Sequence, residues 1–534
     1  KMKIINKLFK SFLKKENLLL VGILLLAAFY RLYKIDDYMT FLGDEGRDVL
    51  VVYNILHGHL TLLGPTSSVG GFFLGPIYYY FMAPFLFLSN YNPAGPAVMV
   101  ALFGVVTVFL VYKIGSEFFG KEAGVIASIL YAISPLVVSY SRSSWNPNLM
   151  PFFTLLCLYT LYKAVLKKRL LLFVATGILY GILMQLHYIE FFVGVIILVY
   201  VLFTSIILNN PGKNSWVKII KEIFKRNLAI LFGFLIGFSP YLAFEARHGF
   251  TNTSNIIKFI FNSPDVSAGG NTLYIIGEIF FRIFARLLTS FPSPEQFGLY
   301  NKPLLSLWIA GVIILGVLSF GYFLLSFLKL WKKKEDKFLQ YSIILFWFVI
   351  GIVLFSFYKK SIYDYYFEFM FPLPFIFLGS LLYAIYKSEK LKIFGKVAAI
   401  TVFVVLFVIN ILGTPFRYEP NRQLNQMRTI ADFVMTRTDA KPFNFALITG
   451  GNSDHAYRYF FTIWGHPPTT IEYPGKDPKR KTVTDQLFVI CESLPCEPVG
   501  HSLWEIAGFG QAEIAGEWDV SVVKVYKLVH YKGK

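Results

Sequence analysis

Charged side chains are scarce in this chain. Asp, Glu, Lys and Arg make up 16% of its 534 residues, whereas 55% of the residues are hydrophobic. Soluble globular proteins carry roughly 25% charged residues, so this composition excludes an ordinary soluble protein. The 56 Phe and 33 Tyr residues suit lipid-facing and interfacial positions. We therefore predict a polytopic α-helical membrane protein.

Cysteine is almost as rare, with 3 residues. Cys157 lies inside an apolar run, where we expect it to pack. Cys491 and Cys496, in the sequence CESLPC, are the only candidate pair, and they could form a disulfide bond in an oxidising compartment. Because no further Cys or His cluster accompanies them, the pattern does not indicate a zinc site.

Basic residues do not form one continuous patch, although the formal net charge is +19. The lysines lie in short clusters between apolar runs, which is typical of cytoplasmic loops. We therefore predict no nucleic-acid partner. The first apolar run ends in YRLYK at 30–34 without a small-residue cleavage site, so we expect it to remain as a membrane span.

A membrane-spanning helix needs roughly 20 apolar residues, and the sequence predicts about 11 crossings. They lie near residues 18–33, 96–113, 122–140, 149–166, 170–187, 191–208, 228–246, 304–328, 338–357, 365–386 and 393–412. The run 72–88 is left out, because counting it would place every later lysine cluster opposite the lysine-rich start. We expect an interfacial or re-entrant helix there, broken by Gly75-Pro76 and Pro84.

This arrangement predicts a multi-pass protein of a prokaryotic plasma membrane, with a cytoplasmic N-terminus. The transmembrane module would cover 1–413, with outside loops at 35–95 and 247–302, and an extracytoplasmic α/β domain would cover 414–534. In that domain we expect helices over 424–434 and 454–464, and strands over 443–448, 486–491 and 518–529. The GGNS turn at 450–453 resembles a ligand loop, but such turns are common between a strand and a helix, so we assign it no role.

The stretch FLGDEGRDVLVVYNILHG at 41–58 follows the first predicted span. Asp44 and Asp48 are four residues apart and share one face of a helix, whereas apolar residues recur at spacings typical of an interfacial helix. Like charges on one face need a counter-charge, a metal ion or a catalytic role. An ordinary charged helix start explains the stretch equally well, since acids near a helix N-terminus complement its dipole.

Polar residues from several predicted outside loops could meet at one site. Sugar transfer from a lipid phosphate needs a carboxylate that accepts a proton and cations that stabilise the departing phosphate. Asp44 or Glu45 could be the carboxylate. The candidate cations are Arg142, Arg247, Lys359 and Lys360. Unrelated loop charges, or interfacial anchoring in the case of the two lysines, would give the same pattern.

Three motifs in this order resemble the GT-C superfamily of membrane glycosyltransferases: Asp44-Glu45 after the first span, GPIYYY at 75–80, and Ser141-Arg142 after the third span. The chain is most similar to the protein O-mannosyltransferases and to the aminoarabinose transferases that modify lipid A. This resemblance implies a polyprenyl-phosphate-linked sugar donor and an inverting transfer. By similarity, Asp44 would be the general base, Glu45 would orient the acceptor, and Arg142 would contact the donor phosphate.

Two positions depart from that family. Pro147 stands where an acid is frequent, which leaves Asn146 or Asn148 as hydrogen-bonding substitutes, and Gly75 stands where His or Lys is frequent. The resemblance implies no cofactor, although Asp44, Glu45 or Asp48 could hold a divalent metal ion. The further candidate residues lining the site are Arg47, Asp48, Tyr79, Asn146, Asn148, His187, Glu245, His248 and Tyr363.

We therefore predict a glycosyltransferase that acts at the outer face of the plasma membrane, with a protein, lipid or polysaccharide acceptor. The alternative is a transporter or flippase of a lipid-linked glycan, which would need a polar path through the membrane. The predicted spans hold few charges at mid-bilayer, which disfavours this alternative. A receptor or scaffold is a third reading, but anchorage requires far fewer spans than this chain has.

Overall fold

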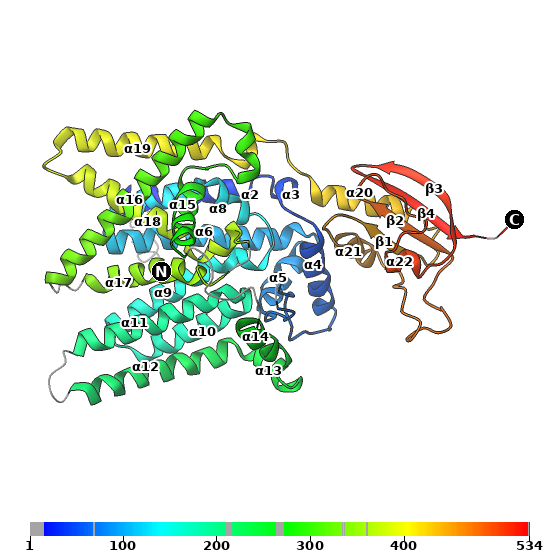
Figure 1. Ribbon diagram of the computed structural model, residues 1–534, viewed down its shortest axis with the longest axis horizontal. Coiled ribbons are helices and arrows are strands. Elements are labelled where there is room, and N and C mark those ends of the chain that lie inside the picture. Colours follow the sequence, from blue (N-terminus) through cyan, green and yellow to red (C-terminus); the bar gives the residue numbers. More distant parts are fainter. Residues whose placement is uncertain are drawn as a thin grey trace, which may run out of the picture.

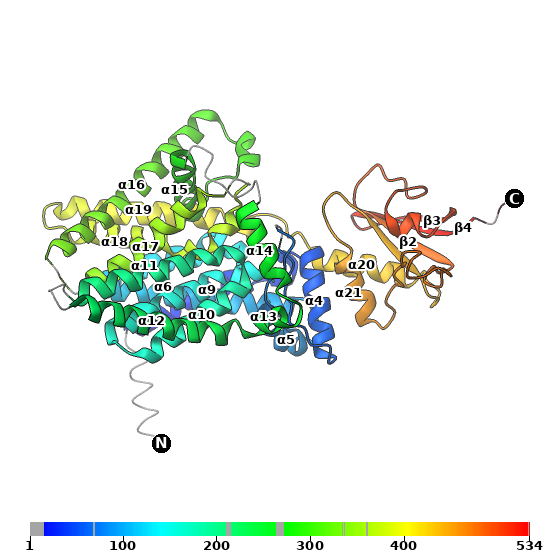
Figure 2. The same ribbon diagram turned by 60° about the horizontal axis from the view of Figure 1, so that its bottom comes forward.

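The computed structural model describes residues 15–67, 70–209, 215–262, 272–333, 335, 337–358, 361–531 and 533. A large helical bundle and a small α/β domain occupy its two ends (Figure 1). Helix α4 (Gly43–Leu56) lies between them, as a second view also shows (Figure 2). The fold class predicted from the sequence, an α-helical membrane protein with a C-terminal α/β domain, is confirmed.

The bundle consists of long apolar helices joined by short turns. Its α-helices are α2 (Lys15–Leu32), α6 (Ala94–Phe119), α7 (Lys121–Ile133), α8 (Pro135–Tyr140), α9 (Met150–Lys167), α10 (Leu170–Leu186), α11 (Phe191–Asn209), α12 (Ser215–Gly237), α13 (Ser239–Arg247), α14 (Thr251–Asn262), α15 (Thr272–Leu288), α16 (Lys302–Lys333), α17 (Phe338–Phe355), α18 (Pro372–Lys387) and α19 (Lys392–Leu412). Its short 3-10 helices are η1 (Asn146–Leu149), η2 (Tyr188–Glu190), η3 (Pro294–Leu299), η4 (Asp364–Met370) and η5 (Pro415–Arg417).

Of the described helices, 6 are long and apolar enough to cross a membrane, or up to 8 if each of two bent pairs forms one span. The bent pairs are α12 with α13, at 70°, and η4 with α18, at 55°. Each predicted span coincides with a helix, a bent pair or, for 122–140, the two helices α7 and α8 on either side of Ser134. The chain is a multi-pass membrane protein, and its exact number of crossings stays a prediction.

The first predicted outside loop folds into three short helices, α3 (Ile35–Tyr38), α4 and α5 (Ile77–Leu88). The predicted helix in 41–58 is confirmed as α4, which buries Val49, Val52 and Ile55 on one face. The helix expected in 72–88 is α5, which begins directly after Pro76. The break expected at Pro84 is wrong, because α5 continues through this residue. The second outside loop, at 247–302, is more ordered than expected, since it contains α14, α15 and η3.

The C-terminal domain has a four-stranded sheet in the order β1-β2-β4-β3. Its elements are α20 (Gln423–Met435), β1 (Asn444–Ile448), α21 (His455–Ile463), β2 (Gln486–Cys491), α22 (Trp504–Ala507), β3 (Ala512–Val520) and β4 (Val523–His530). Strands β1 and β2 are parallel, and β4 is antiparallel to both β2 and β3. The helices and strands predicted at 424–491 are confirmed.

The prediction of one long strand over 518–529 is wrong. This segment contains the end of β3, a turn and most of β4, and Ser521 in the turn has a φ of 56°. The turn lacks the Gly, Asn or Asp-Gly pattern that usually marks a hairpin. The alternation of apolar residues changes phase at Val522-Val523, and this change marks the break in the sequence.

The two faces of the sheet belong to two apolar cores. Phe445 and Phe488 point into the core that continues through α20 and α21 to the bundle, whereas Leu487 and Val489 pack with Phe509 on the opposite face. Adjacent residues of β2 thus face opposite sides, as the pleat of a strand requires. The first core joins the C-terminal domain to the rest of the molecule.

Two glycines in α4 allow the C-terminal domain to approach closely. A Cβ atom on Gly46 would lie 2.3 Å from the backbone nitrogen of Ala456 in α21, and one on Gly43 would lie 2.1 Å from Ser453 Oγ. No other residue type fits at such distances without a shift of the backbone. Phe41 adds an edge-to-face contact with Phe460, with ring centroids 5.8 Å apart.

We predict that Gly46→Ala loosens this interface, because the added methyl group meets backbone atoms that cannot rotate away. Overpacking of this kind costs about 1–3 kcal/mol. Thermal unfolding of the purified protein should therefore begin at a lower temperature, and the 414–422 connection should become more sensitive to protease. Gly277→Ala in α15 is the matched control, because nothing lies within 4 Å of its added Cβ. Equal stability of the two variants would contradict this account of the interface.

Candidate active site

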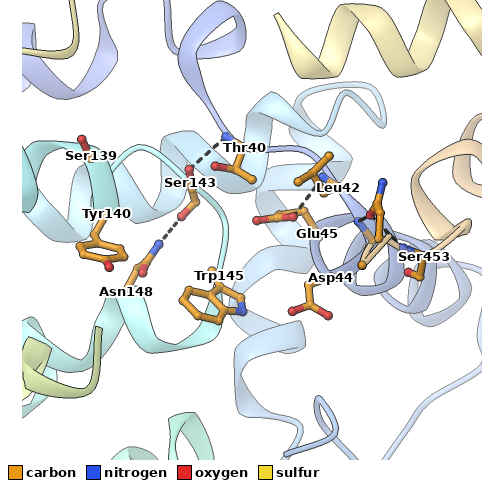
Figure 3. Close-up of a pocket in the computed structure, with 13 residues that line it drawn as sticks. Thr40, Leu42, Asp44, Glu45, Ser139, Tyr140, Ser143, Trp145, Asn148 and Ser453 are labelled. Atoms are coloured by element: carbon orange, nitrogen blue, oxygen red, sulfur yellow. Dashed lines mark hydrogen bonds between the residues drawn. The ribbon is translucent and has the colours of Figure 1, made fainter. Parts of the chain in front are cut away.

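A cavity of about 630 Å³ lies where the bundle, α4 and the C-terminal domain meet. Its volume is within the range of about 300–1,000 Å³ that is usual for small-molecule sites. Three segments far apart in the sequence line it, and Figure 3 shows their side chains around one opening. The lining residues are Thr40, Leu42, Gly43, Asp44, Glu45, Ser139, Tyr140, Ser143, Trp145, Asn148, Gly451, Asn452 and Ser453.

Asp44 is the second residue of α4, and its side chain is 57% exposed at the edge of this cavity. A carboxylate at a helix N-terminus is stabilised by the helix dipole. Arg47, one turn further along, contacts Asp44 with an N–O distance of 2.9 Å and Asp48 with one of 2.8 Å. The arginine thus supplies the counter-charge that the two acids require, and Asp44 remains accessible from the cavity.

Glu45 and Asp48 are buried, in contrast to Asp44. The Glu45 carboxylate accepts a hydrogen bond from the Leu42 amide at 3.1 Å, and burial raises the pKa of Glu45 to about 7. Burial likewise raises the pKa of Asp48 to about 6, against the opposing effect of Arg47. Tyr79 donates to Asp48 Oδ1 at 3.2 Å, whereas Asp48 Oδ2 has no hydrogen-bond partner among the described residues. These two acids hold the start of α4 in place.

The segment after α8 forms the wall opposite Asp44. The Thr40 amide donates to Ser143 Oγ at 3.1 Å, and Asn148 Nδ2 donates to the Ser143 carbonyl at 2.8 Å. The Oδ1 atom of Asn148 is buried and has no protein partner in the described chain. Asn148 lines the cavity, although this oxygen itself is not exposed to it. The indole ring of Trp145 borders the same opening (Figure 3).

Arg142 lies elsewhere than the sequence predicted. It is buried, and its guanidinium group donates to the carbonyls of Tyr30, Tyr33 and Lys34 at 2.8, 2.6 and 3.2 Å. These carbonyls lie at and just beyond the end of α2, where the helix leaves such groups without internal partners. Among the described residues, Arg142 is not one of those that line the cavity. The geometry therefore favours a structural role over a contact with a donor phosphate.

The other predicted cations are Arg247, Lys359 and Lys360. Arg247 is exposed at the end of α13, among residues that do not line it. Lys359 and Lys360 lie outside the described residues, so their predicted role stays a prediction. The family departure at Gly75 has a packing reason, since a Cβ atom there would lie 2.2 Å from Gln185 Cγ.

Several further predicted residues have local structural partners. His187 is buried and its Nδ1 atom accepts from the Ile189 amide at 3.3 Å, and Asn146 donates to the Leu186 carbonyl at 2.6 Å. Glu245 accepts from the amides of Asn252 and Thr253, at the start of α14. The remaining two are surface residues: the exposed His248 contacts the Phe244 carbonyl, and Tyr363 is 56% exposed. In the described chain none of these five lines the cavity.

A second cavity, of about 580 Å³, lies beside the first and shares Ser139 with it. Helices α16 and α19 contribute apolar residues, among them Leu304, Leu307 and Leu412. Arg286 and Arg417 also line it. Arg286 donates to Asp364 Oδ2 at 2.8 Å, whereas Arg417 makes one long contact of 3.4 Å to the Leu412 carbonyl. The cavity thus combines a surface suited to an acyl or isoprenoid chain with two cations.

Sequence reasoning missed the contribution of Asn452 and Ser453. The GGNS turn was set aside because its composition is common, and nothing in the sequence links it to α4. Asn452 Oδ1 accepts from the Gly43 amide at 2.8 Å across 409 residues of sequence. Arg286 lies inside the predicted loop at 247–302 and Arg417 follows the last predicted span, and both were missed because they belong to no recognisable motif.

No group of three or more His, Cys, Asp or Glu residues that could hold a metal ion occurs in the described ranges. Asp44 and Asp48, which the sequence offered as ligands, are instead paired with Arg47. The dependence on a metal stays untested.

Comparisons with known proteins fit this architecture. Residues 74–219 match the family described as dolichyl-phosphate-mannose-protein mannosyltransferase. Over 82 residues, the chain is 37% identical to the proposed mannosyltransferase YkcB of Bacillus subtilis (strain 168). That alignment covers 15% of this chain and 12% of the relative, so the chain matches only a small part of that protein's length.

Two solved structures share the fold. ArnT from Cupriavidus metallidurans, bound to undecaprenyl phosphate, matches with a TM-score of 0.57 at 13% identity, over 96% of this chain and 97% of that chain. The oligosaccharyltransferase AglB from Archaeoglobus fulgidus, in complex with an inhibitory peptide and a dolichol-phosphate, matches with a TM-score of 0.53 at 14% identity. That match covers 90% of this chain and 70% of AglB. The fold is therefore that of the GT-C membrane glycosyltransferases, as the sequence motifs predicted.

The raised pKa of Glu45 predicts a pH dependence of stability. Its pKa in the folded protein, about 7, exceeds the ordinary value of 4.5, so the folded state binds more protons between these values. Stability should therefore fall as the pH rises from about 4.5 to 7. Glu45→Gln should remove this part of the pH dependence of stability. The contribution of Asp48, whose pKa is raised to about 6, should remain and lie at somewhat lower pH.

The measurement is the unfolding temperature in detergent between pH 4.5 and 8. The exposed Glu389 supplies the control, since Glu389→Gln should leave the pH dependence of the wild-type protein unchanged. A Glu45→Gln protein with the wild-type slope would show that Glu45 ionises normally in the folded state.

Proposed function

We propose that this chain is an inverting glycosyltransferase. It moves a sugar from a polyprenyl-phosphate-linked donor to an acceptor hydroxyl or amide, with Asp44 as the general base. The matched family, the relative from Bacillus subtilis and the two structural neighbours are described as glycosyl- or mannosyltransferases, or carry a lipid phosphate. The observation that carries the proposal is the position of Asp44, an accessible carboxylate at a helix N-terminus that borders a cavity of about 630 Å³.

The reaction requires the acceptor to attack the anomeric carbon from the side opposite the phosphate. A new bond forms between the acceptor atom and this carbon, and the bond between the carbon and the phosphate oxygen breaks. The polyprenyl phosphate leaves with the electron pair, and Asp44 takes the proton of the acceptor. Arg47 holds the Asp44 carboxylate in one orientation.

The second cavity is the proposed site of the donor lipid. Its leucine-rich lining lies on helices at the outer surface of the bundle, where a polyprenyl chain can enter from the membrane. Arg417 and Arg286 replace Arg142 as the candidates for binding the phosphate of the donor. Because both cavities touch Ser139, a sugar on a lipid in the second cavity could extend into the first.

We propose that the cavity and the C-terminal domain face the outside of the cell. The lysine clusters of the sequence support this orientation through the positive-inside rule. The disulfide bond between Cys491 and Cys496 also supports it, because disulfides persist in oxidising compartments and are rare in the cytosol.

The first test of this function is Asp44→Asn, which preserves the shape of the side chain but cannot accept the proton. Loss of a general base typically lowers the rate by about 10²–10⁴-fold. Transfer of a labelled sugar from a polyprenyl phosphate donor to a crude envelope acceptor should fall by this factor. Asp519→Asn, at an exposed acid of β3, should behave as the wild type. Full activity in the Asp44→Asn variant would remove Asp44 as the base.

The donor site makes a separate prediction. Arg417→Gln should raise the KM for the donor by about 10-fold and change kcat by less than about 2-fold, because the lost contact to phosphate binds substrate and transition state alike. Lys392→Gln is the control, since this lysine is at the opposite end of α19, roughly 30 Å away for a helix of this length. An unchanged KM in the Arg417→Gln variant would place the phosphate elsewhere.

A further inference from the structure

We infer that Asn452 of the C-terminal domain is a positioning residue for Asp44, and that Glu492 in turn fixes Asn452. This inference rests on the proposed function, because it concerns the same carboxylate. It gives the C-terminal domain a defined part in the reaction, although none of the acids or histidines in its described residues lines the cavity.

Helix α4 does not supply its own N-terminal cap. The residue before its first turn is Leu42, which has no polar side chain, whereas helices prefer Ser, Thr, Asp or Asn there. The Leu42 amide is satisfied by Glu45 of the same helix. The Gly43 amide, by contrast, donates to Asn452 Oδ1 at 2.8 Å. The C-terminal domain therefore provides the cap that the local sequence lacks.

The side chain of Asn452 is held in one orientation. Its Oδ1 atom also accepts from the Ser453 amide at 2.8 Å, and its Nδ2 group donates to the two oxygens of Glu492 at 3.0 and 3.2 Å. The oxygen of the Asn452 side chain thus accepts a hydrogen bond from α4, and its nitrogen donates to Glu492 within the C-terminal domain. Reversal of the group would place NH₂ against the Gly43 amide, so the Glu492 carboxylate selects the orientation that caps α4.

Glu492 is the centre of a small hydrogen-bond network. Thr449 and Tyr457 both donate to its carboxylate at 2.8 Å, and its own amide donates to the Ile448 carbonyl at 2.9 Å. It directly follows Cys491, whose disulfide bond to Cys496 closes the segment into a loop. The network therefore connects the ends of β1 and β2 to the start of α4.

This connection matters for catalysis because Asp44 directly follows Gly43. If the Gly43 amide loses its acceptor, the first turn of α4 can fray, and the Asp44 carboxylate moves with it. A displacement of about 1 Å of a catalytic group can lower the rate by about 100-fold. Binding of a donor lipid in the second cavity, which Asn452 does not line, should change little.

The test exchanges the two partners. Asn452→Asp places a second carboxylate against Glu492, and the repulsion should displace the side chain at position 452 from the Gly43 amide. We expect kcat to fall by about 10- to 100-fold, with the donor KM within about 2-fold of the wild type. The double variant Asn452→Asp with Glu492→Gln restores a donor–acceptor pair with the same total charge. Its kcat should recover to within about 3-fold of the wild type, which a general loss of stability would not allow.

Asn92→Ala is the matched control. Asn92 Oδ1 accepts from the Ala94 amide at 3.0 Å and so caps α6, a helix that does not carry Asp44. Loss of the Asn92 side chain should lower the unfolding temperature by about as much as loss of the Asn452 cap does, and it should leave kcat unchanged.

A second measurement does not depend on activity. Hydrogen exchange of the amides of residues 43–46 in the full-length protein should be faster in the Asn452→Asp variant, and return to the wild-type rate in the double variant. Wild-type exchange in Asn452→Asp would overturn the inference, even if no sugar transfer were detected. A wild-type kcat in the Asn452→Asp variant would also overturn the inference. Full activity in Asp44→Asn, by contrast, would contradict the proposed function and not the contact between Asn452 and Gly43.

Discussion

The hydrogen bond between the Gly43 amide and Asn452 connects the two parts of the molecule at the point where its chemistry would occur. A helix start needs acceptors for its first amides, and here one acceptor comes from the helix itself and the other from the C-terminal domain. An amide buried without an acceptor costs about 1–3 kcal/mol, so neither part can move freely without the other. The glycines at 43 and 46 are the counterpart of this requirement, because they let the backbones come close enough for the bond to form.

A similar device fixes the bundle side of the cavity. Arg142 gathers three carbonyls at the end of α2, and its guanidinium group lies 4.9 Å from the ring centre of Phe416, in the connection to the C-terminal domain. An arginine that satisfies backbone carbonyls near a membrane surface fixes the exit of the first helix, and hence the path of the chain toward Asp44. Tyr78 adds a bond to Ser144 at 2.8 Å, which joins α5 to the same wall. The cavity is therefore enclosed by segments that are tied to one another through buried polar contacts.

The sequence was informative where the structure of a segment depends mainly on the residues of that segment. Apolar runs predicted the helices of the bundle, and the spacing of apolar and acidic residues predicted α4 and the accessible Asp44. Prediction from the sequence failed where the structure depends on contacts between segments that are far apart in the chain. The sequence could not link the GGNS turn to Gly43. It also could not show that Arg142 contacts the carbonyls at the end of α2, because a cation beside a predicted span resembles a binding residue as much as a helix cap. The hairpin of β3 and β4 was missed because Ser521 and its neighbours lack a turn signal.

Asn452 is separated from its partner Gly43 by 409 positions in the chain. During synthesis the bundle helices are made and inserted before the C-terminal domain, and α4 would then be without its cap until that domain has been made and folded. If the proposed orientation holds, that domain must also be exported before its disulfide bond can form. Helix α4 thus acquires its cap only after the C-terminal domain has folded, so that under the proposed function a chain without this domain would transfer little sugar from its donor.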